Sequence, residues 1–158
     1  MKKGIISILS GAVGAVAGIG AMGKICGKQI NRKSELADKH LALYMLMTQW
    51  VKIKQEGKSL VSYFEANGYH NIAVYGMNYV GQTLCKELEN SSVTVKYGID
   101  QNAENIYADC EVITMDDELE SVDAIIVTPI YYFEEIEGKL VEKVDCPIIS
   151  IEDIMYEV

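Results

Sequence analysis

Short apolar runs alternate with amphipathic segments along the second half of the chain. Residues 72–75 and 124–127 are continuous runs that include β-branched residues, which is typical of parallel strands buried on both faces. Between them, Val80, Leu84 and Leu88 recur four residues apart, and this spacing predicts a helix with one apolar face. Strands that alternate with helices in this way require a parallel sheet with crossover connections.

The pattern continues to the end of the chain and predicts an α/β fold. Residues 68–158 are expected to form a Rossmann-like parallel sheet of about five strands with flanking helices. The expected strands are 72–75, 93–100, 111–113, 124–127 and 147–151, and the expected helices are 79–89, 133–144 and 152–158.

A helical stalk over residues 34–67 is expected to precede this domain. Its first helix, 34–56, has Ser34 as the expected N-cap and Gly57 as the expected residue after its end. This helix carries more apolar surface than a solitary helix leaves exposed, so it packs on the following domain, on a second copy of the chain or on a membrane. A homo-oligomer through this helix, or through the N-terminal segment, is the expected assembly. A shorter helix over 58–66 follows.

Residues 1–33 hold a run of 20 residues without a charge, from Gly4 to Gly23, between lysines. The length suits one bilayer crossing, and small residues four apart let helices approach closely in lipid. A membrane-embedded, self-associating helix is the leading interpretation. A cleaved secretory signal ending near Ala17 and a peripheral glycine-rich tail are the alternatives. If the helix spans, the basic residues after it place the C-terminal domain in the cytoplasm, on a membrane-associated protein.

Charge is distributed very unevenly along the chain. Residues 1–70 carry 10 Lys and Arg against 4 Asp and Glu, whereas residues 71–158 carry 4 against 19. The acidic residues 71–158 repel a phosphate backbone, so nucleic-acid binding is not expected there. The basic N-terminal part of the chain suits an anionic membrane surface. The four cysteines have no metal-binding spacing, which predicts no metal site. Except for Cys26, they are typical of small buried residues in a reducing compartment.

The turn after the first expected strand carries most of the chemical information. In dinucleotide-binding folds the sequence G-x-G-x-x-G follows this strand, with one glycine for the turn, one for close approach to pyrophosphate and one for helix packing. Gly76 and Gly81 fill the outer positions here, but Asn78 stands in the middle one. Because Asn tolerates left-handed backbone angles, the turn is still expected to form, although pyrophosphate contact is weakened.

Asp100 lies 24 residues after Gly76, where an acidic side chain accepts hydrogen bonds from a ribose diol. Residues 71–158 contain no Arg, and their few Lys residues do not cluster near Asp100, so NADP is disfavoured against an unphosphorylated ribose. Thr128 and Pro129 are expected to line the same crevice, with the following tyrosines available to stack on a base. The candidate cofactor-binding residues are Gly76, Met77, Asn78, Tyr79, Val80, Gly81, Asp100, Gln101, Thr128, Pro129 and Tyr131.

The segments IAVYGMNYVG, YGID and VDAIIVTPIYYF resemble those of short Rossmann-like, NAD-binding-like domains of bacterial proteins. Such domains are often found near surface-polysaccharide and nucleotide-sugar genes. The resemblance covers residues 68–158 and implies NAD or a UDP-sugar-like nucleotide as the ligand, while the fold itself hosts many activities.

No catalytic apparatus is visible in the sequence. Short-chain enzymes of this type use Tyr-x-x-x-Lys as acid and base, whereas Glu135 and Ile136 stand four residues after Tyr131 and Tyr132. No histidine follows His70, so a general acid or base would have to be Asp, Glu or Tyr.

The expected function is therefore a membrane-tethered, cytoplasmic accessory or sensing module that binds a nucleotide or nucleotide-sugar without catalysis of its own. Two alternatives stay open. One is a ligand-free structural or oligomerisation protein with a vestigial Rossmann-like domain. The other is a nucleotide-sugar enzyme that depends on a partner subunit.

Overall fold

The computed structural model describes residues 33–158, and the expected apolar helix over 4–23 lies outside this range. The chain divides into two compact units, and the second, Ala42–Val158, holds the α/β fold. In the first unit, residues 33–41 are helical, with a salt bridge of 2.7 Å between Lys39 and Glu35. Among the helices of residues 33–158, none combines the length and the apolar character needed to cross a bilayer.

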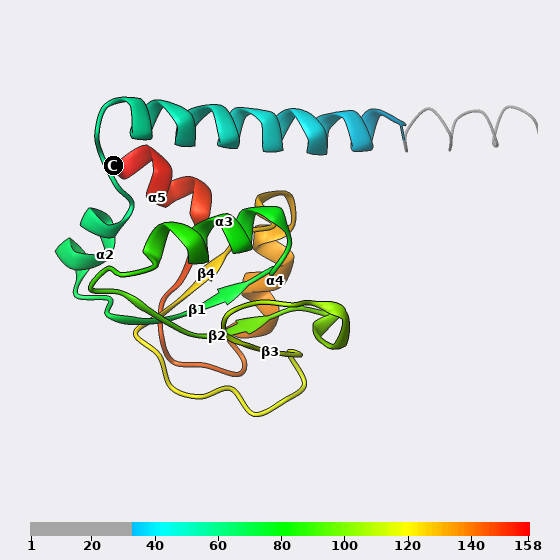
Figure 1. Ribbon diagram of the computed structural model, residues 1–158. Coiled ribbons are helices and arrows are strands. Elements are labelled where there is room, and N and C mark those ends of the chain that lie inside the picture. Colours follow the sequence, from blue (N-terminus) through cyan, green and yellow to red (C-terminus); the bar gives the residue numbers. More distant parts are fainter. Residues whose placement is uncertain (1–32) are drawn as a thin grey trace, which may run out of the picture. The chain divides into compact units, whose positions relative to one another are not determined.

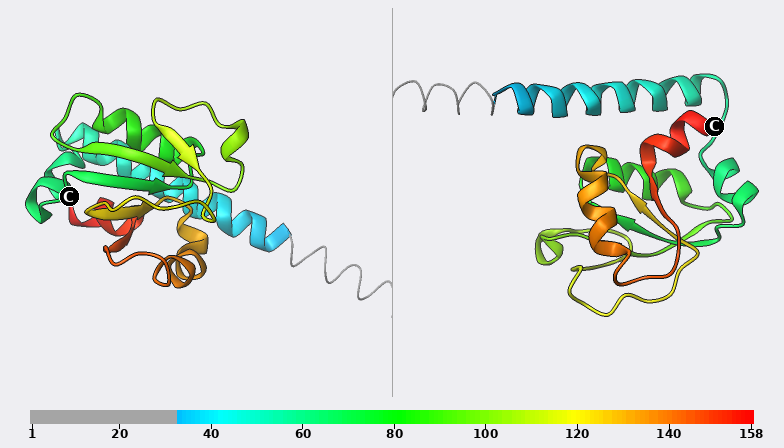
Figure 2. Two further views of the ribbon diagram at one scale, coloured as in Figure 1. Left: turned by 90° about the horizontal axis from the view of Figure 1, so that it is seen from below. Right: turned by 180° about the vertical axis from the view of Figure 1, so that it is seen from behind.

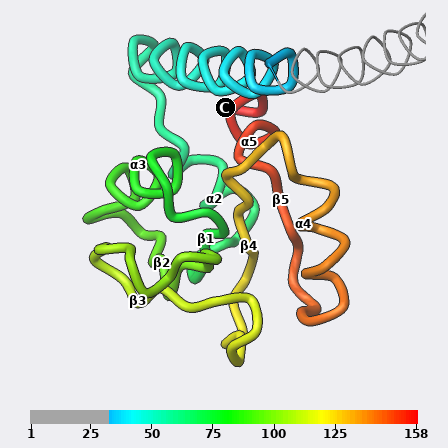
Figure 3. Tube along the Cα trace, turned by 90° about the vertical axis from the view of Figure 1, so that its right-hand side faces the viewer, coloured from blue at the N-terminus to red at the C-terminus, as the bar shows by residue number. Residues whose placement is uncertain are grey.

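The centre of the fold is a five-stranded sheet in the order β3-β2-β1-β4-β5, and every neighbouring pair is parallel (Figure 1). This confirms the expected five-stranded parallel α/β sheet. The strands are β1 (Asn71–Tyr75), β2 (Thr94–Ile99), β3 (Glu111–Ile113), β4 (Ala124–Val127) and β5 (Ile148–Ser150). Figure 3 shows them in this order, from β3 to β5. The order is that of the first five strands of a doubly wound dinucleotide-binding sheet, with its switch point between β1 and β4.

The two central strands are the continuous apolar runs of the sequence. All four residues of β4 are buried, and they pair in register with β1 from Ile72–Ala124 to Tyr75–Val127. Alternate β1 residues face opposite sides of the sheet: Ile72 and Val74 belong to one core cluster, and Ala73 and Tyr75 to the other. Burial on both faces explains why these strands read as unbroken apolar runs.

The helices lie where the sequence predicts them, but the one expected over 133–144 ends at Leu140. They are α2 (Val61–Asn67), α3 (Tyr79–Leu88), α4 (Phe133–Leu140) and α5 (Ile151–Glu157), with short 3-10 turns η1 (Ala103–Asn105) and η2 (Ile130–Tyr132). Residues 33–55 are also helical. Because this helix already includes Lys33, the prediction that Ser34 is its N-cap is wrong. Gly57 does adopt the left-handed conformation expected after the helix, with φ +74°.

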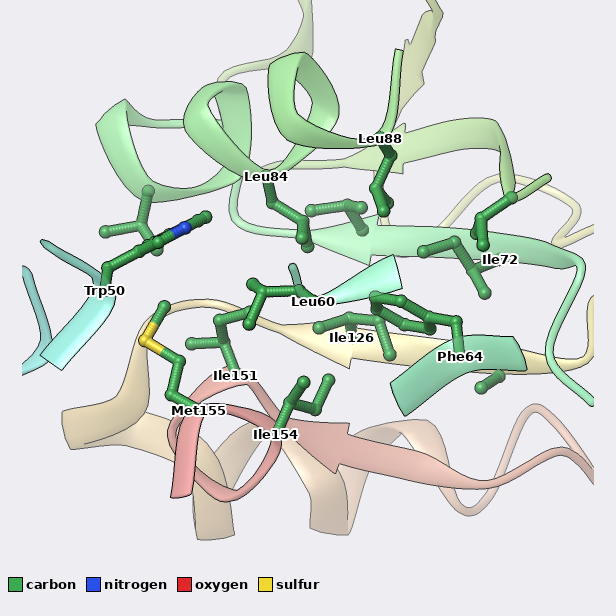
Figure 4. Packing of buried hydrophobic residues seen from close by; sticks show 14 of the residues in the cluster. Trp50, Leu60, Phe64, Ile72, Leu84, Leu88, Ile126, Ile151, Ile154 and Met155 are labelled. Atoms are coloured by element: carbon green, nitrogen blue, oxygen red, sulfur yellow. The ribbon is translucent and has the colours of Figure 1, made fainter. Parts of the chain in front are cut away.

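Helices cover both faces of the sheet. On one face, α3, α5 and α2 pack with helical residues 42–55 around the larger core cluster. Figure 4 shows Leu60 near the middle of this cluster, with Trp50 at one end and Phe64 at the other. On the opposite face, Ile136 and Leu140 of α4 (orange in Figure 2) pack on the sheet.

The helix over 42–55 is part of this core. Leu46, Trp50 and Ile53 are at most 4% exposed, so the alternative in which the predicted 34–56 helix packs on the following domain is confirmed for this part of it. The indole N–H of Trp50 donates to Glu87 on α3 at 2.6 Å, and the Glu87 side chain is only 5% exposed. A buried ionised carboxylate is tolerated only when it is well bonded, so this contact fixes the helix on the domain.

Candidate functional site

The carboxyl ends of β1, β2 and β4 border a hollow of about 430 Å³. Open α/β sheets bind their ligands at this edge, where the strand order reverses, and small-molecule sites have volumes of roughly 300–1,000 Å³. The hollow is lined by Tyr75, Gly76, Asp100, Gln101, Asn102, Pro129, Tyr132, Glu135, Ile136 and Lys139.

Two glycines shape the turn that leads from β1 into α3. Gly76 has φ +90°, and a Cβ there would lie 2.6 Å from Pro129 Cδ and 2.8 Å from Thr128 Oγ1. A Cβ on Gly81 would overlap the carbonyl oxygen of Gly76. The first position therefore needs glycine for its backbone conformation, and the second for close packing of the helix on the strand.

Asn78 plays a different part from the one its position suggested. Its backbone is extended, with φ −82° and ψ −160°, so the expectation that the turn depends on left-handed tolerance at Asn78 is wrong. Gly76 supplies the left-handed residue instead. The Asn78 side chain accepts the N–H of Tyr79 at 2.9 Å and so forms the N-cap of α3.

Met77 divides its roles between backbone and side chain. The side chain is 1% exposed and lies over Gly98 of β2, where an added Cβ would approach Met77 Cγ to 2.5 Å. Its backbone N–H donates to Asp100 Oδ2 at 2.9 Å. Met77 thus belongs to the core, and only its backbone reaches the polar groups of the turn.

The Asp100 carboxylate is already engaged by the protein on both oxygens. Oδ2 accepts from Met77, and Oδ1 accepts the N–H of Asn102 at 2.9 Å. A carboxylate offers about four lone pairs, so each oxygen keeps room for another donor such as a ribose hydroxyl. The carboxylate therefore connects the glycine turn to the loop after β2 and still faces the hollow.

Thr128 follows β4 and bonds to the turn that follows β1. It is 5% exposed, and its hydroxyl donates to the carbonyl of Gly76 at 2.7 Å, with the Tyr75 carbonyl 3.2 Å away. This bond connects the end of β4 to the turn, and Pro129, the residue after Thr128, lines the hollow. Tyr132 also lines it, whereas Tyr131 lies outside, with its ring centroid 5.5 Å from that of Tyr132.

Of the predicted residues, the hollow brings together Gly76, Asp100, Gln101 and Pro129. The others lie elsewhere: Met77, Val80, Gly81 and Thr128 are buried in the packing around the turn, and Asn78, Tyr79 and Tyr131 are exposed outside the hollow.

Sequence reasoning missed the contribution of α4. Glu135 and Lys139 line the hollow and form a salt bridge of 2.6 Å, so one paired lysine shares the hollow with Asp100 although it is distant in the sequence. This ion pair lowers the pKa of Glu135 and raises that of Lys139. The available signal was the i, i+4 Glu–Lys pair in the helix that follows β4, because Glu135 lies in the first turn of this crossover helix, which faces the carboxyl edge of the sheet.

Tyr75, at the end of β1, was also missed because it reads as an ordinary strand residue. Burial raises the pKa of its phenol, helped by the carboxylates of Asp100 and Glu135, while a hydrogen bond with Gln101 and the charge of Lys139 oppose the rise. The phenol is therefore a protonated hydrogen-bond donor at neutral pH.

The charges of the hollow are two carboxylates and one ammonium, and the ammonium is paired. Together with the amides of Gln101 and Asn102, this set suits sugar hydroxyls better than a free phosphate. Within residues 33–158, no group of three His, Cys, Asp or Glu side chains is placed to hold a metal ion.

Comparison with known proteins gives no match: no family model, no curated protein and no solved structure has significant similarity to the chain.

Proposed function

We propose that the hollow binds the ribose end of a nucleotide or nucleotide-sugar and that the chain is an accessory or sensing module without catalysis of its own. The observation that carries the proposal is the position of Asp100, Gln101 and Asn102 on a hollow at the switch point, beside the end of β2. In doubly wound folds this is where an acidic side chain accepts hydrogen bonds from a ribose diol.

The chemistry of the lining favours an unphosphorylated ribose. Asp100 retains acceptor capacity, the Tyr75 phenol is a donor, and Tyr132 supplies an aromatic face for a base. A phosphate inside the hollow would meet the carboxylates of Asp100 and Glu135, with Lys139 already paired. NAD and UDP-sugars are therefore the preferred candidates over NADP, in keeping with the resemblance to domains near nucleotide-sugar genes.

A ligand-free structural protein is the second candidate. It is favoured by the bonds from Met77 and Asn102 to Asp100, because the carboxylate then has a role in folding without any ligand. In this alternative Asp100 only connects the turn to the loop after β2, and the hollow is a feature of the fold that binds no ligand.

Binding of defined probes to the full-length chain separates the two candidates. NAD, NADP and UDP-glucose are titrated by calorimetry against the wild-type chain, Tyr132→Ala and the matched control Tyr131→Ala. We expect NAD or UDP-glucose to bind more tightly than NADP, with about tenfold weaker binding in Tyr132→Ala and none of this loss in Tyr131→Ala, as for a base–aromatic stack. Absence of binding by all three probes, or equal loss in both variants, would reject this site.

The membrane anchor is a separate part of the proposal and rests on the uncharged run over 4–23 and its basic flanks. The full-length chain is expected to sediment with membranes, and a chain lacking residues 1–23 is expected to stay in the supernatant. Sedimentation of both forms, or of neither, would remove the anchor without affecting the ligand site.

A further inference from the structure

Two cysteines that are far apart in the sequence meet beside α3. Cys85 lies on this helix, and Cys110 immediately precedes β3. Both are free thiols of intermediate exposure, and both pack against the larger core cluster. They line the same surface hollow of about 260 Å³, so a small reagent can reach the pair.

The two thiols interact directly and unequally. A hydrogen bond from Cys85 lowers the pKa of Cys110 to about 7; burial opposes this shift, and backbone N–H groups of Cys110 and Gly98 add to it. The same interaction, together with burial, raises the pKa of Cys85. The carboxylate of Asp109 acts against ionisation of both thiols. Cys110 therefore ionises more readily than Cys85, which is its proton-bearing neighbour.

Cys146 provides a contrast within the same domain. It is also partly exposed and free, but it packs with the opposite core cluster, and burial raises its pKa. Thiolate character and access to a partner thiol are the two properties that distinguish redox-active cysteines from inert buried ones. The pair beside α3 has both properties.

We propose that Cys85 and Cys110 are a reversible redox pair, which hydroperoxides oxidise to an intramolecular disulfide. In the first step the Cys110 thiolate attacks one oxygen of hydrogen peroxide. An S–O bond forms, the O–O bond breaks, and the departing hydroxide takes a proton to become water. Sulfur loses two electrons in this step and the peroxide gains them.

In the second step the sulfur of Cys85 attacks the sulfenic sulfur of Cys110. The S–S bond forms, the S–O bond breaks, and the thiol proton of Cys85 leaves with the hydroxide as water. A dithiol reductant reverses the sequence by thiol–disulfide exchange, so that both protein thiols are recovered.

The disulfide would join α3 to the far end of the loop that follows β2. This loop begins at Asp100, whose carboxylate is bonded to the turn before α3, and it ends at Cys110. Oxidation would therefore attach the loop to the turn and helix at both ends. The inference does not depend on a ligand in the neighbouring hollow, because it rests on the two thiols alone.

The test uses the full-length chain, reduced and then exposed to hydrogen peroxide. Free thiols are blocked with N-ethylmaleimide, and the chain is digested and analysed by mass spectrometry. We expect a linked peptide pair containing Cys85 and Cys110, lighter than the two reduced peptides by two hydrogen atoms, and reduced again by dithiothreitol. Cys146 is expected to remain alkylated, with oxidation about tenfold slower than at Cys110.

Single variants then test the order of the steps. Cys85→Ser should accumulate a sulfenic acid at Cys110 that dimedone traps, Cys110→Ser should leave Cys85 reduced, and the matched control Cys146→Ser should oxidise as the wild type does. Continued alkylation of both cysteines in the oxidised wild type, or linkage of Cys110 to Cys26 or to a second chain, would overturn the proposal. The wild-type measurement needs no substitution, so it tests the proposal even if a variant fails to fold.

Discussion

The backbone N–H of Met77 donates a hydrogen bond of 2.9 Å to Oδ2 of Asp100. Met77 lies in the glycine turn after β1, and Asp100 follows the last residue of β2, so the bond joins the ends of two neighbouring strands. Asp100 lies at the position where dinucleotide-binding folds recognise a ribose, and in this protein its carboxylate also stabilises the glycine turn. This relationship makes Asp100 important for stability, whether or not a ligand is bound.

Replacement of Asp100 by Ala is therefore expected to destabilise the fold. The N–H groups of Met77 and Asn102 would lose their acceptor, which costs about 1.5–3 kcal/mol of unfolding free energy, measured by urea denaturation. Glu104→Ala, at an exposed position in the same loop, is the control and should change stability by about 0.5 kcal/mol or less. Equal stability of the two variants would show that the hydrogen bond to the turn contributes little.

Two Gly→Ala substitutions in helices should have opposite effects. Gly81→Ala places a methyl group on the carbonyl oxygen of Gly76 and should cost about 3 kcal/mol or more, because the obstacle is backbone. Gly138→Ala, in α4, meets nothing within 4 Å and should add about 0.5–1 kcal/mol of stability through helix propensity. Thermal unfolding monitored by circular dichroism measures both. A neutral Gly81→Ala would contradict the close approach of α3 to the end of β1.

Met77 and Gly98 should be coupled energetically. Gly98→Ala brings a methyl group to 2.5 Å from Met77 Cγ, and Met77→Ala removes the side chain that it meets. Each single variant is expected to destabilise the fold, and the double variant should be more stable than the sum of the two predicts by about 1 kcal/mol. Urea denaturation of the four proteins of this cycle gives the coupling energy, and strict additivity would refute direct contact.

Glu87 is expected to make stability depend on pH in the acid range. Burial acts to raise its pKa, but hydrogen bonds from Lys54, from the N–H of Leu60 and from Trp50 outweigh this and lower it below the ordinary value of 4.5. A carboxyl whose pKa is lower in the folded state stabilises the fold above its unfolded pKa, and this contribution is lost as pH falls through the folded pKa.

The wild type should therefore lose more stability than Glu87→Gln when the pH is lowered from 7 to about 3, as measured by urea midpoints. At neutral pH, Glu87→Gln should itself be less stable, because it replaces the charged acceptor of the 2.6 Å bonds from Trp50 and Lys54. Glu89→Gln, at the residue that follows the same helix, is the control, since Glu89 is exposed and forms a surface pair with Lys86. Parallel pH profiles for the wild type and Glu87→Gln would contradict the assignment.

Much of the fold follows from local pattern. The apolar runs 72–75 and 124–127 differ from β1 and β4 by at most one residue, and Gly57 and Gly68 follow their helices with positive φ. These features are predictable because burial on both faces of a strand, and the left-handed residue after a helix, leave signals within a few residues of sequence. The start of the helix that includes residues 33–55 did not follow from such a signal, since Lys33 is helical and Ser34 is not its N-cap.

The sequence by itself determined the parallel α/β sheet and the two glycines that shape its first turn. Only the tertiary structure decided which side chains share a site: Lys139 and Asp100 line one hollow, Cys110 meets Cys85, and Met77 fills the space over Gly98. The physical reason is the range of the interactions. Periodicity and turn chemistry act between neighbours in the chain, whereas these contacts join segments that only the folded sheet brings together.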